Sequence, residues 1–278
     1  MERVVLGYDG SPASEAALDW TADWARLEPV ELDIVLVANM FLSDRREADS
    51  LLDAAVRRWR SLAPGAPANV VRLDGVMPGT LTGAAQDAAL LVMGVHPGFR
   101  VRTMLSGSVP LRAAARSGAP TVLVPPGWSA SDEPVTVGLA SDESSTAALL
   151  FAAKTAARAG VSLRIVHSWL MGSAQRGSTA LRLDSQQVAV EHEHLVDAAA
   201  ERVRAAYPEL VVAGELVRDN PTSALTRAAD RSSLVVLGTH SRGVVAGGLL
   251  GSTGLDLIGS LERPICVVPA TGPTRFPG

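Results

Sequence analysis

The stretch LVVLGTHSRGVVAGGLLGST, residues 234–253, decides the fold because nearly the same pattern occurs once before in the chain. Here an apolar run stops at a glycine, passes through a glycine-dotted loop and ends at Gly251-Ser252-Thr253. The earlier stretch, LVMGVHPGFRVRTMLSGSV at 91–109, follows the same order. Three features recur at one spacing of 144 positions (238 − 94): Gly94 and Gly238, His96 and His240, and Gly107-Ser108 and Gly251-Ser252. This fixed register indicates an internal duplication.

The duplication reaches the front of each half. The segment RVVLGYDGSPASEAAL, residues 3–18, corresponds to PVTVGLASDESSTAAL, residues 134–149, with Gly7 opposite Gly138. Each half closes with an apolar strand next to proline, in GAPTVLVPP and in ERPICVVPA. Between the halves, PPGWSASDEP is rich in proline, glycine, serine and charge, which is typical of a boundary. We therefore predict domains at 1–127 and 134–270, a linker at 128–133 and a tail at 271–278.

Within each half, short runs of Val, Ile and Leu alternate with helical segments. Strands that are apolar on both faces and separated by helices predict a parallel sheet covered on both sides. We count five strands per half and predict two flavodoxin-like or Rossmann-like α/β domains. Ser11 and Pro12 are residue types suited to an N-cap and a first helical position, and Gly160 is a stop signal after a predicted helix. The segment 171–184 is expected to be a surface insertion.

The composition excludes several classes of protein. Of the 278 residues, 47% are apolar and 19% are charged, so the chain can bury a core and is not expected to be mainly disordered. The net charge of −4 argues against general nucleic-acid binding, and no apolar run is long enough to span a membrane. The start has no apolar signal stretch and the chain has one cysteine, so we expect a cytoplasmic protein. That residue, Cys266, is expected to be an inert core thiol, and Trp20 and Trp24 are expected in the core.

The loops after the fourth strands carry the features of an anion site. In open α/β sheets, ligands bind beyond the carboxyl ends of the strands, and Gly94 and Gly238 lie at such ends. Glycine lets the backbone approach a ligand closely. Gly107-Ser108 and Gly251-Ser252-Thr253 precede short helices, whose first amides lack helical partners and carry partial positive charge. This combination predicts a phosphate site without a lysine, although the same residue types also serve ordinary turns and helix caps.

In both halves, these motifs resemble the universal stress protein family in its tandem two-domain form. Nucleotide-binding members of that family carry G-x2-G-x9-G-[ST] after the fourth strand. This chain has the same spacing twice, with Pro97 and Ser241 in place of the second glycine. The resemblance covers nearly the whole chain. It implies a stress-response protein that binds an adenine nucleotide, ATP, with or without Mg²⁺.

The resemblance also implies ligand contacts in the first half. Asp9 matches an acidic residue that contacts the nucleoside sugar, and Val37 matches the position whose backbone meets adenine. Pro97 removes one amide donor from the predicted phosphate loop. The residues matched on the phosphate side are Gly94, His96, Gly107, Ser108 and Val109.

The second half matches less completely. Ala140 occupies the position of the acidic residue, and Asp142 lies two residues later. We expect the first site to be the better one, because Asp9 is intact there. The residues matched in the second half are Val166, Gly238, His240, Gly251, Ser252 and Thr253.

Two other functions stay open. One is an interaction module that has lost nucleotide binding, which Pro97, Ser241 and Ala140 favour. The other is slow hydrolysis of ATP in the same cleft, with His96 or His240 beside a serine. The sequence has no G-x-S-x-G elbow, no P-loop motif and no positioned base, so we do not predict an enzyme.

The expected partners follow from the resemblance and from the side chains. The resemblance suggests that the fifth strands, TVLVP and ICVVP, meet between the halves, and that chains pair again as homodimers through these strands. No nucleic-acid or membrane partner is expected. We also expect no metal site, since His192 and His194 are two residues apart on a predicted helix and lack metal-ligand spacing. Both are predicted to lie on a solvated helix face.

Overall fold

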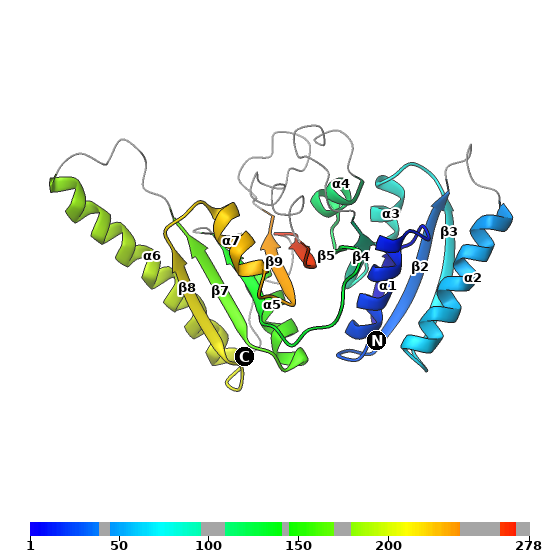
Figure 1. The fold of residues 1–278 in the computed structure, drawn as a ribbon, viewed down its shortest axis with the longest axis horizontal. Coiled ribbons are helices and arrows are strands. Elements are labelled where there is room, and N and C mark those ends of the chain that lie inside the picture. The colour runs from blue at the N-terminus through cyan, green and yellow to red at the C-terminus, as the bar shows by residue number, and fades with distance from the viewer. Residues whose placement is uncertain (39–44, 96–108, 141–144, 170–178, 240–261, 271–278) are drawn as a thin grey trace.

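The computed structural model describes residues 1–38, 45–95, 109–140, 145–169, 179–239 and 262–270, with the backbone alone for 179–186. Strands and helices alternate through both halves, as the apolar periodicity predicts (Figure 1). The first half contains β1 (Glu2–Gly7), α1 (Pro12–Trp24), β2 (Val30–Ala38), α2 (Arg45–Leu62), β3 (Ala68–Asp74), α3 (Gly79–Ala84), β4 (Leu90–Gly94), α4 (Val109–Arg116) and β5 (Thr121–Val124). The second half contains β6 (Val135–Leu139), α5 (Ser145–Ala159), β7 (Leu163–Ser168), α6 (Thr179–Ala206), β8 (Val212–Val217), α7 (Pro221–Ala229), β9 (Leu234–Gly238) and β10 (Ile265–Val268).

The described strands form one sheet in the order β3-β2-β1-β4-β5-β10-β9-β6-β7-β8. Neighbouring strands within each half are parallel, so the predicted parallel sheets of five strands are confirmed. The two sheets are continuous because β5 and β10 pair antiparallel, with Cys266 opposite Val122. The expected meeting of the fifth strands is therefore confirmed within the chain.

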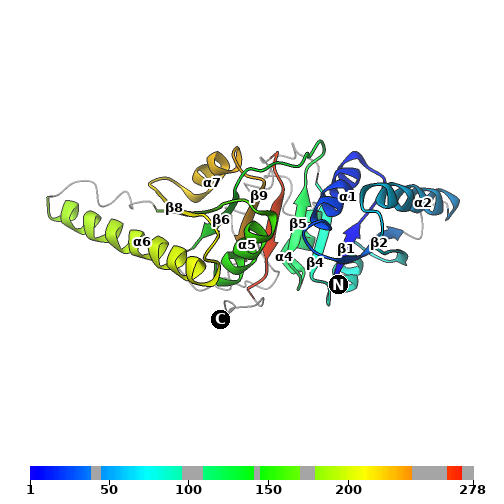
Figure 2. The same ribbon diagram turned by 90° about the horizontal axis from the view of Figure 1, so that it is seen from below.

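Helices cover both faces of this sheet, as Figures 1 and 2 show. Alternate strand residues point to opposite faces. One core contains Leu6, Leu32 and Ile165 and packs against α1, α2, α5 and α6. The other contains Val5 and Val35 and packs against α3, α4 and α7. Both faces are apolar because each one meets a helical layer.

The halves also meet through helices. Trp24 of α1 stacks on Phe151 of α5, with ring centroids 6.0 Å apart and an interplanar angle of 7°. Trp20 stacks on Trp24 with centroids 5.4 Å apart, so the aromatic contact extends along α1. Both tryptophans are buried, as predicted.

Ion pairs flank this aromatic contact. Lys154 Nζ of α5 lies 2.7 Å from Glu2 Oε1 of β1, and Arg158 pairs with Glu2 and with Glu28. These side chains are partly exposed, so we assign most of the stability of the junction to the strand pairing and the rings.

The predicted local signals are found where expected. The Ser11 side chain accepts a hydrogen bond from the Ser14 amide and caps α1, and Pro12 is the first helical residue. Gly160 follows α5 with a φ of +67°, a conformation that favours glycine. Cys266 is fully buried, and burial raises the pKa of its thiol well above the usual range. Among the described helices, none combines the length and apolar content needed to cross a membrane.

One expectation about the insertion is wrong. Residues 179–184 of the predicted surface insertion belong to α6, which begins at Thr179. Helix-favouring residues such as Ala, Leu and Arg in TALRLD are compatible with this extension. Residues 171–178 of the same segment lie outside the described residues.

The aromatic contact between the halves can be tested by Phe151→Ala. Because Phe151 is only half-buried, we expect the free energy of unfolding to fall by about 2 kcal/mol, less than the ~3–5 kcal/mol typical of a fully buried phenylalanine. Urea unfolding followed by tryptophan fluorescence measures this change. The control is Val188→Ala on the exposed part of α6, which should change the midpoint little. An unchanged midpoint in Phe151→Ala would show that the ring contact does not stabilise the junction.

Candidate functional site

A cavity of about 360 Å³ lies at the carboxyl end of the sheet in the first half. Four residues predicted from the sequence line it: Asp9, Val37, Gly94 and Val109. Asp9 follows β1, Val37 and Gly94 belong to β2 and β4, and Val109 begins α4. The parallel sheet order brings these segments to one edge. Such an edge is where open α/β sheets bind ligands.

The floor of the cavity is apolar. Val35 and Val37 of β2, Leu81 of α3 and Met93 of β4 line it together with Met77. Val35, Leu81 and Met93 are buried, whereas Met77 is half-buried. A floor of this kind suits a flat, weakly polar group, because pockets for small molecules combine apolar walls with a few placed polar groups.

The start of α1 supplies polar groups at the rim. The exposed Asp9 accepts a hydrogen bond from the Ser11 amide at 3.0 Å. The Ser14 amide donates to Ser11 Oγ at 3.2 Å, and the Asp9 amide donates to Ser14 Oγ at 3.4 Å. This turn fixes the Asp9 carboxylate at the mouth of the cavity, next to a helix N-terminus that favours negative charge.

The start of α4 also faces the cavity, since Val109 and Pro110 line it. The first amides of a helix have no helical partner and carry partial positive charge. Pro110 has no N–H, so Val109 and Leu111 offer the first donors. Two helix N-termini therefore border one cavity, which makes it a suitable place for an anionic group.

Gly94 has a structural role that the sequence did not reveal. A Cβ at Gly94 would lie 2.3 Å from the carbonyl carbon of Ala13 and 2.5 Å from the Ser14 nitrogen. These are backbone atoms of α1, which cannot give way as a flexible side chain does. Gly94 therefore allows the start of α1 to pack onto the end of β4, and this contact helps to shape the cavity.

A hydrogen-bonded network supports the cavity from behind. Tyr8, a lining residue, donates its hydroxyl to Glu15 of α1. Arg58 of α2 pairs with Glu15 at 3.1 Å and with Asp19 at 2.6 Å. Burial, followed by the hydrogen bond to Glu15, raises the pKa of Tyr8 well above its usual range, so the hydroxyl keeps its proton at neutral pH. The network holds α1 against α2.

Two backbone contacts of this site recur in the described residues of the second half, but the Asp9 carboxylate does not. The Ala140 amide donates to Ser145 Oγ at 2.7 Å, as the Asp9 amide donates to Ser14 Oγ. Ala140 therefore takes the place of Asp9, as predicted, and supplies no carboxylate. The Thr239 amide likewise donates to the Val268 carbonyl at 2.9 Å, as the Val95 amide does to Val124 at 2.8 Å. These matches place Gly238 at the end of β9, where Gly94 ends β4.

The predicted position of Val166 needs a correction. Gly7 pairs with Val35 and Gly138 pairs with Val166, so Val166 corresponds to Val35 and not to Val37. The counterpart of Val37 is Ser168, two residues later. The two strands are apolar runs without a marker residue, so their sequences do not show this shift.

Several predicted residues lie outside the described part of the chain. In the first half they are His96, Pro97, Gly107 and Ser108. In the second half they are His240, Ser241, Gly251, Ser252, Thr253 and Asp142. Their roles stay predictions.

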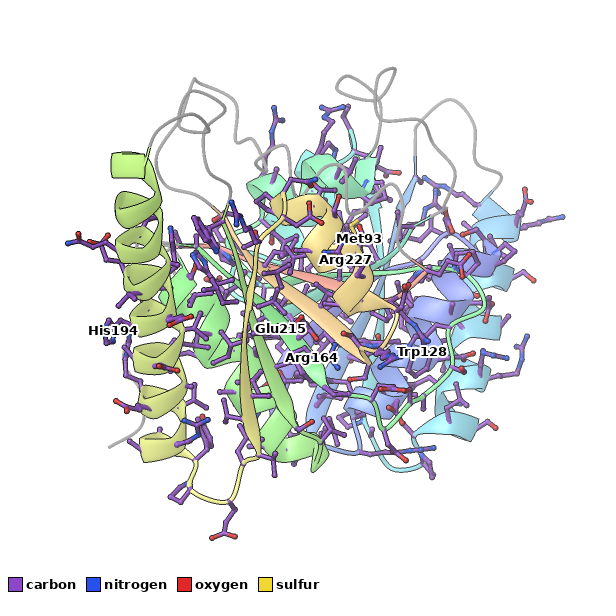
Figure 3. All side chains as sticks on the ribbon, turned by 60° about the vertical axis from the view of Figure 1, so that its left-hand side comes forward. Met93, Trp128, Arg164, His194, Glu215 and Arg227 are labelled. Carbon is purple, nitrogen blue, oxygen red and sulfur yellow. The ribbon has the colours of Figure 1, made fainter. Side chains whose placement is uncertain are left out.

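Sequence reasoning also missed residues that line the cavity. Ser14, Met77 and Met93 carried no motif that singled them out. One signal for Ser14 was present, because Ser145 stands at the matching place in the second half. The prediction that His192 and His194 are both solvated is half wrong: His194 is exposed on the outer side of α6 (Figure 3), but His192 is half-buried and contacts His167.

Comparisons with known proteins agree with the duplication. The model of the universal stress protein family matches residues 1–125 and again residues 133–269. Universal stress protein MT2052 of Mycobacterium tuberculosis is 26% identical over 95% of this chain and 94% of its own length. Universal stress protein Mb2028c of Mycobacterium bovis is 28% identical over 95% of this chain and 96% of its own. The crystal structure of a universal stress protein from Archaeoglobus fulgidus matches with a TM-score of 0.67 at 17% identity, over 96% of both chains.

The close approach at Gly94 can be tested by Gly94→Ala. The added methyl group must displace the backbone of α1, so we expect the free energy of unfolding to fall by about 2–3 kcal/mol. Gly83→Ala is the matched control, because a Cβ there meets nothing within 4 Å. Since alanine is favoured over glycine inside a helix, the control should gain about 0.5–1 kcal/mol. Equal stabilities of the two variants in chemical denaturation would contradict this role of Gly94.

Proposed function

Because this chain belongs to the universal stress protein family, we propose that it binds an adenine nucleotide, ATP, in the cavity of its first half. The observation that carries the proposal is the meeting of Asp9, Val37, Gly94 and Val109 around that cavity. The bound nucleotide would act as a regulatory signal, read out by conformation or by partner binding in a stress response.

The parts of the cavity match the parts of a nucleotide. Its volume of about 360 Å³ lies within the ~300–1,000 Å³ typical of small-molecule pockets. The apolar floor of Val37, Met77 and Met93 would receive the adenine ring. The Asp9 carboxylate at the mouth can accept hydrogen bonds from ribose hydroxyls. The start of α4 would face the phosphates, and Mg²⁺ could accompany them.

The two halves are not equivalent in this proposal. The second half has Ala140 where the first has Asp9, and the amides of both residues donate to equivalent serines. We therefore propose that the first site binds ATP more tightly than the second.

Two alternatives predicted from the sequence are distinguishable from this proposal. An interaction module without nucleotide is favoured by the missing carboxylate at Ala140. A hydrolase needs a base near the phosphates. Among the described lining residues, Asp9 and Tyr8 have ionisable side chains, and Tyr8 is engaged with Glu15. The proposal therefore includes binding but no turnover.

The homodimer and the cytoplasmic location stay predictions. Both edges of β5 and of β10 are already paired within the chain. A second copy therefore cannot add to these strands by backbone hydrogen bonds, so a dimer would need another surface.

The role of Asp9 can be tested with Asp9→Ala. Loss of hydrogen bonds to a charged acceptor costs about 1.5–3 kcal/mol, so ATP should bind about ten- to a hundredfold more weakly. Isothermal titration calorimetry measures the affinity. Asp132→Ala in the exposed linker makes the same change of charge away from the cavity and should bind like the unmodified protein. No binding heat in the unmodified protein, with no nucleotide released on denaturation, would favour the interaction module.

The inequality of the halves can be tested with Ala140→Asp. The Ala140 position is half-buried and its amide contacts Ser145 as the Asp9 amide contacts Ser14, so the new carboxylate should supply the missing sugar contact. We expect ATP affinity at the second site to rise, seen as a stoichiometry that moves from one toward two in the same calorimetry. If the stoichiometry stays the same, the carboxylate is not what distinguishes the halves.

A further inference from the structure

The second half contains a buried histidine where the first half has a leucine. His167 lies in β7 one residue after Val166, and Leu36 holds the matching position after Val35. His167 is only 3% exposed. A buried titratable group replaces an apolar one at this place, so it needs partners.

The hydrogen bonds of His167 define its tautomer. His167 Nδ1 lies 2.7 Å from the Leu139 carbonyl oxygen, which can only accept, so Nδ1 carries the proton. A neutral imidazole has one N–H, so Nε2 must accept. Its partner is His192 Nδ1 of α6, also at 2.7 Å, which therefore donates. Both bonds are satisfied when His167 is neutral.

The two imidazoles can share one extra proton but not two. A proton on His192 Nε2 leaves the Nδ1 donation to His167 unchanged. A further proton on His167 Nε2 would place two N–H donors face to face at 2.7 Å. The rings must then separate.

Neighbouring rings continue the contact. The His167 and His192 centroids are 4.8 Å apart, and Trp169 stacks on His192 at 5.5 Å. The Arg218 guanidinium lies 5.6 Å from the Trp169 ring centroid. These four residues form a column between β7, α6 and the end of β8.

This column is the outermost anchor of the described part of α6. Among the α6 side chains that the structure describes, from 187 onward, the first buried one is Val196, closer to the C-terminal end, whereas residues 187–191 are mostly exposed. Figure 1 shows the N-terminal end of α6 projecting away from β7 and β8. His192 therefore lies where the packed part of α6 ends.

The other charged groups nearby face elsewhere. On α6, Glu191, Glu193 and His194 are exposed. A Cβ at Gly214 of β8 would meet Val196 of α6, so Gly214 faces α6 and its neighbour Glu215 faces the opposite side of the sheet (Figure 3). On α5, Lys154 and Arg158 pair with glutamates of the first half. Among the described residues, no third ligand completes a metal site with the two histidines.

We propose that His167 and His192 form an acid-sensitive latch, which holds α6 against the carboxyl end of β7 and releases the start of α6 when both rings are protonated.

The direction of the pH effect follows from the environment of His167. Burial, the largest cause, lowers its pKa, the proximity of His192 lowers it further, and the hydrogen bond to Leu139 opposes both. The open state binds the proton near the ordinary value of about 6.5, whereas the closed state does not. The latch is therefore fully closed above that pH, and it weakens as the pH falls from about 6.5 toward the lowered pKa.

Hydrogen–deuterium exchange without nucleotide tests the latch between pH 7.5 and pH 5, corrected for intrinsic exchange rates. Protection of residues 187–195 should fall by up to about tenfold per pH unit in the acid range, because the closed pair can already hold one extra proton and opening takes up the second. Protection of α2, the matching helix of the first half, should not fall in the same way as the pH is lowered. Imidazole ¹⁵N spectra at pH 7.5 should show His167 protonated at Nδ1.

Three variants separate the latch from general acid effects. His167→Leu restores the residue of the first half and should remove the pH dependence. His192→Gln can donate to neutral His167 or accept from its charged form, so it should flatten the pH dependence while the fold is kept. His194→Gln, two residues away and exposed, should behave like the unmodified protein. If His167→Leu does not fold, the pH dependence of exchange in His192→Gln and the His167 tautomer in the ¹⁵N spectra test the proposal instead. Unchanged protection of α6 down to pH 5, or the same pH dependence in His192→Gln, would overturn the proposal.

Discussion

The antiparallel pairing of β5 with β10 is the contact on which the rest of the architecture depends. Both strands are four residues long and entirely buried, and each is hydrogen-bonded on both edges. Without this pairing, each half would end in an apolar strand with an open edge, which invites association with other chains. The pairing also brings α1 beside α5, where Trp24 and Phe151 stack. Each half thus covers the open strand edge of the other within one chain.

With the sheet fixed in this way, the two halves keep one backbone and differ in side chains. The amides of Asp9 and Ala140 donate to equivalent serines, Ser14 and Ser145, so this backbone contact is kept in both halves. The Asp9 carboxylate also accepts a hydrogen bond from the Ser11 amide, and Ala140 offers no such acceptor in the second half. His167 is a change in the other direction. It places a polar group in the core of the second half where the first half has Leu36, and its hydrogen bonds are satisfied there.

The cavity of the first half shows how packing and binding share residues. Gly94 admits the backbone of α1 and also lines the cavity. Tyr8 lines the cavity and ties α1 to α2 through Glu15 and Arg58. The start of α1, which contributes to the electrostatic character of the site, is therefore held in place by the same contacts that stabilise the first half.

The sequence by itself determined the duplication, the parallel α/β architecture and the cap of α1, because these depend on periodicity and on local signals such as Ser11-Pro12. It also predicted that Asp9, Val37, Gly94 and Val109 lie together, since strand ends in a parallel sheet share one edge. Only the tertiary structure decided that Gly94 makes room for α1, that Val166 matches Val35, that residues 179–184 extend α6 and that His192 is half-buried against His167. Each of these depends on register or on a neighbour distant in sequence, and a short apolar run or a helical pattern carries no information about either.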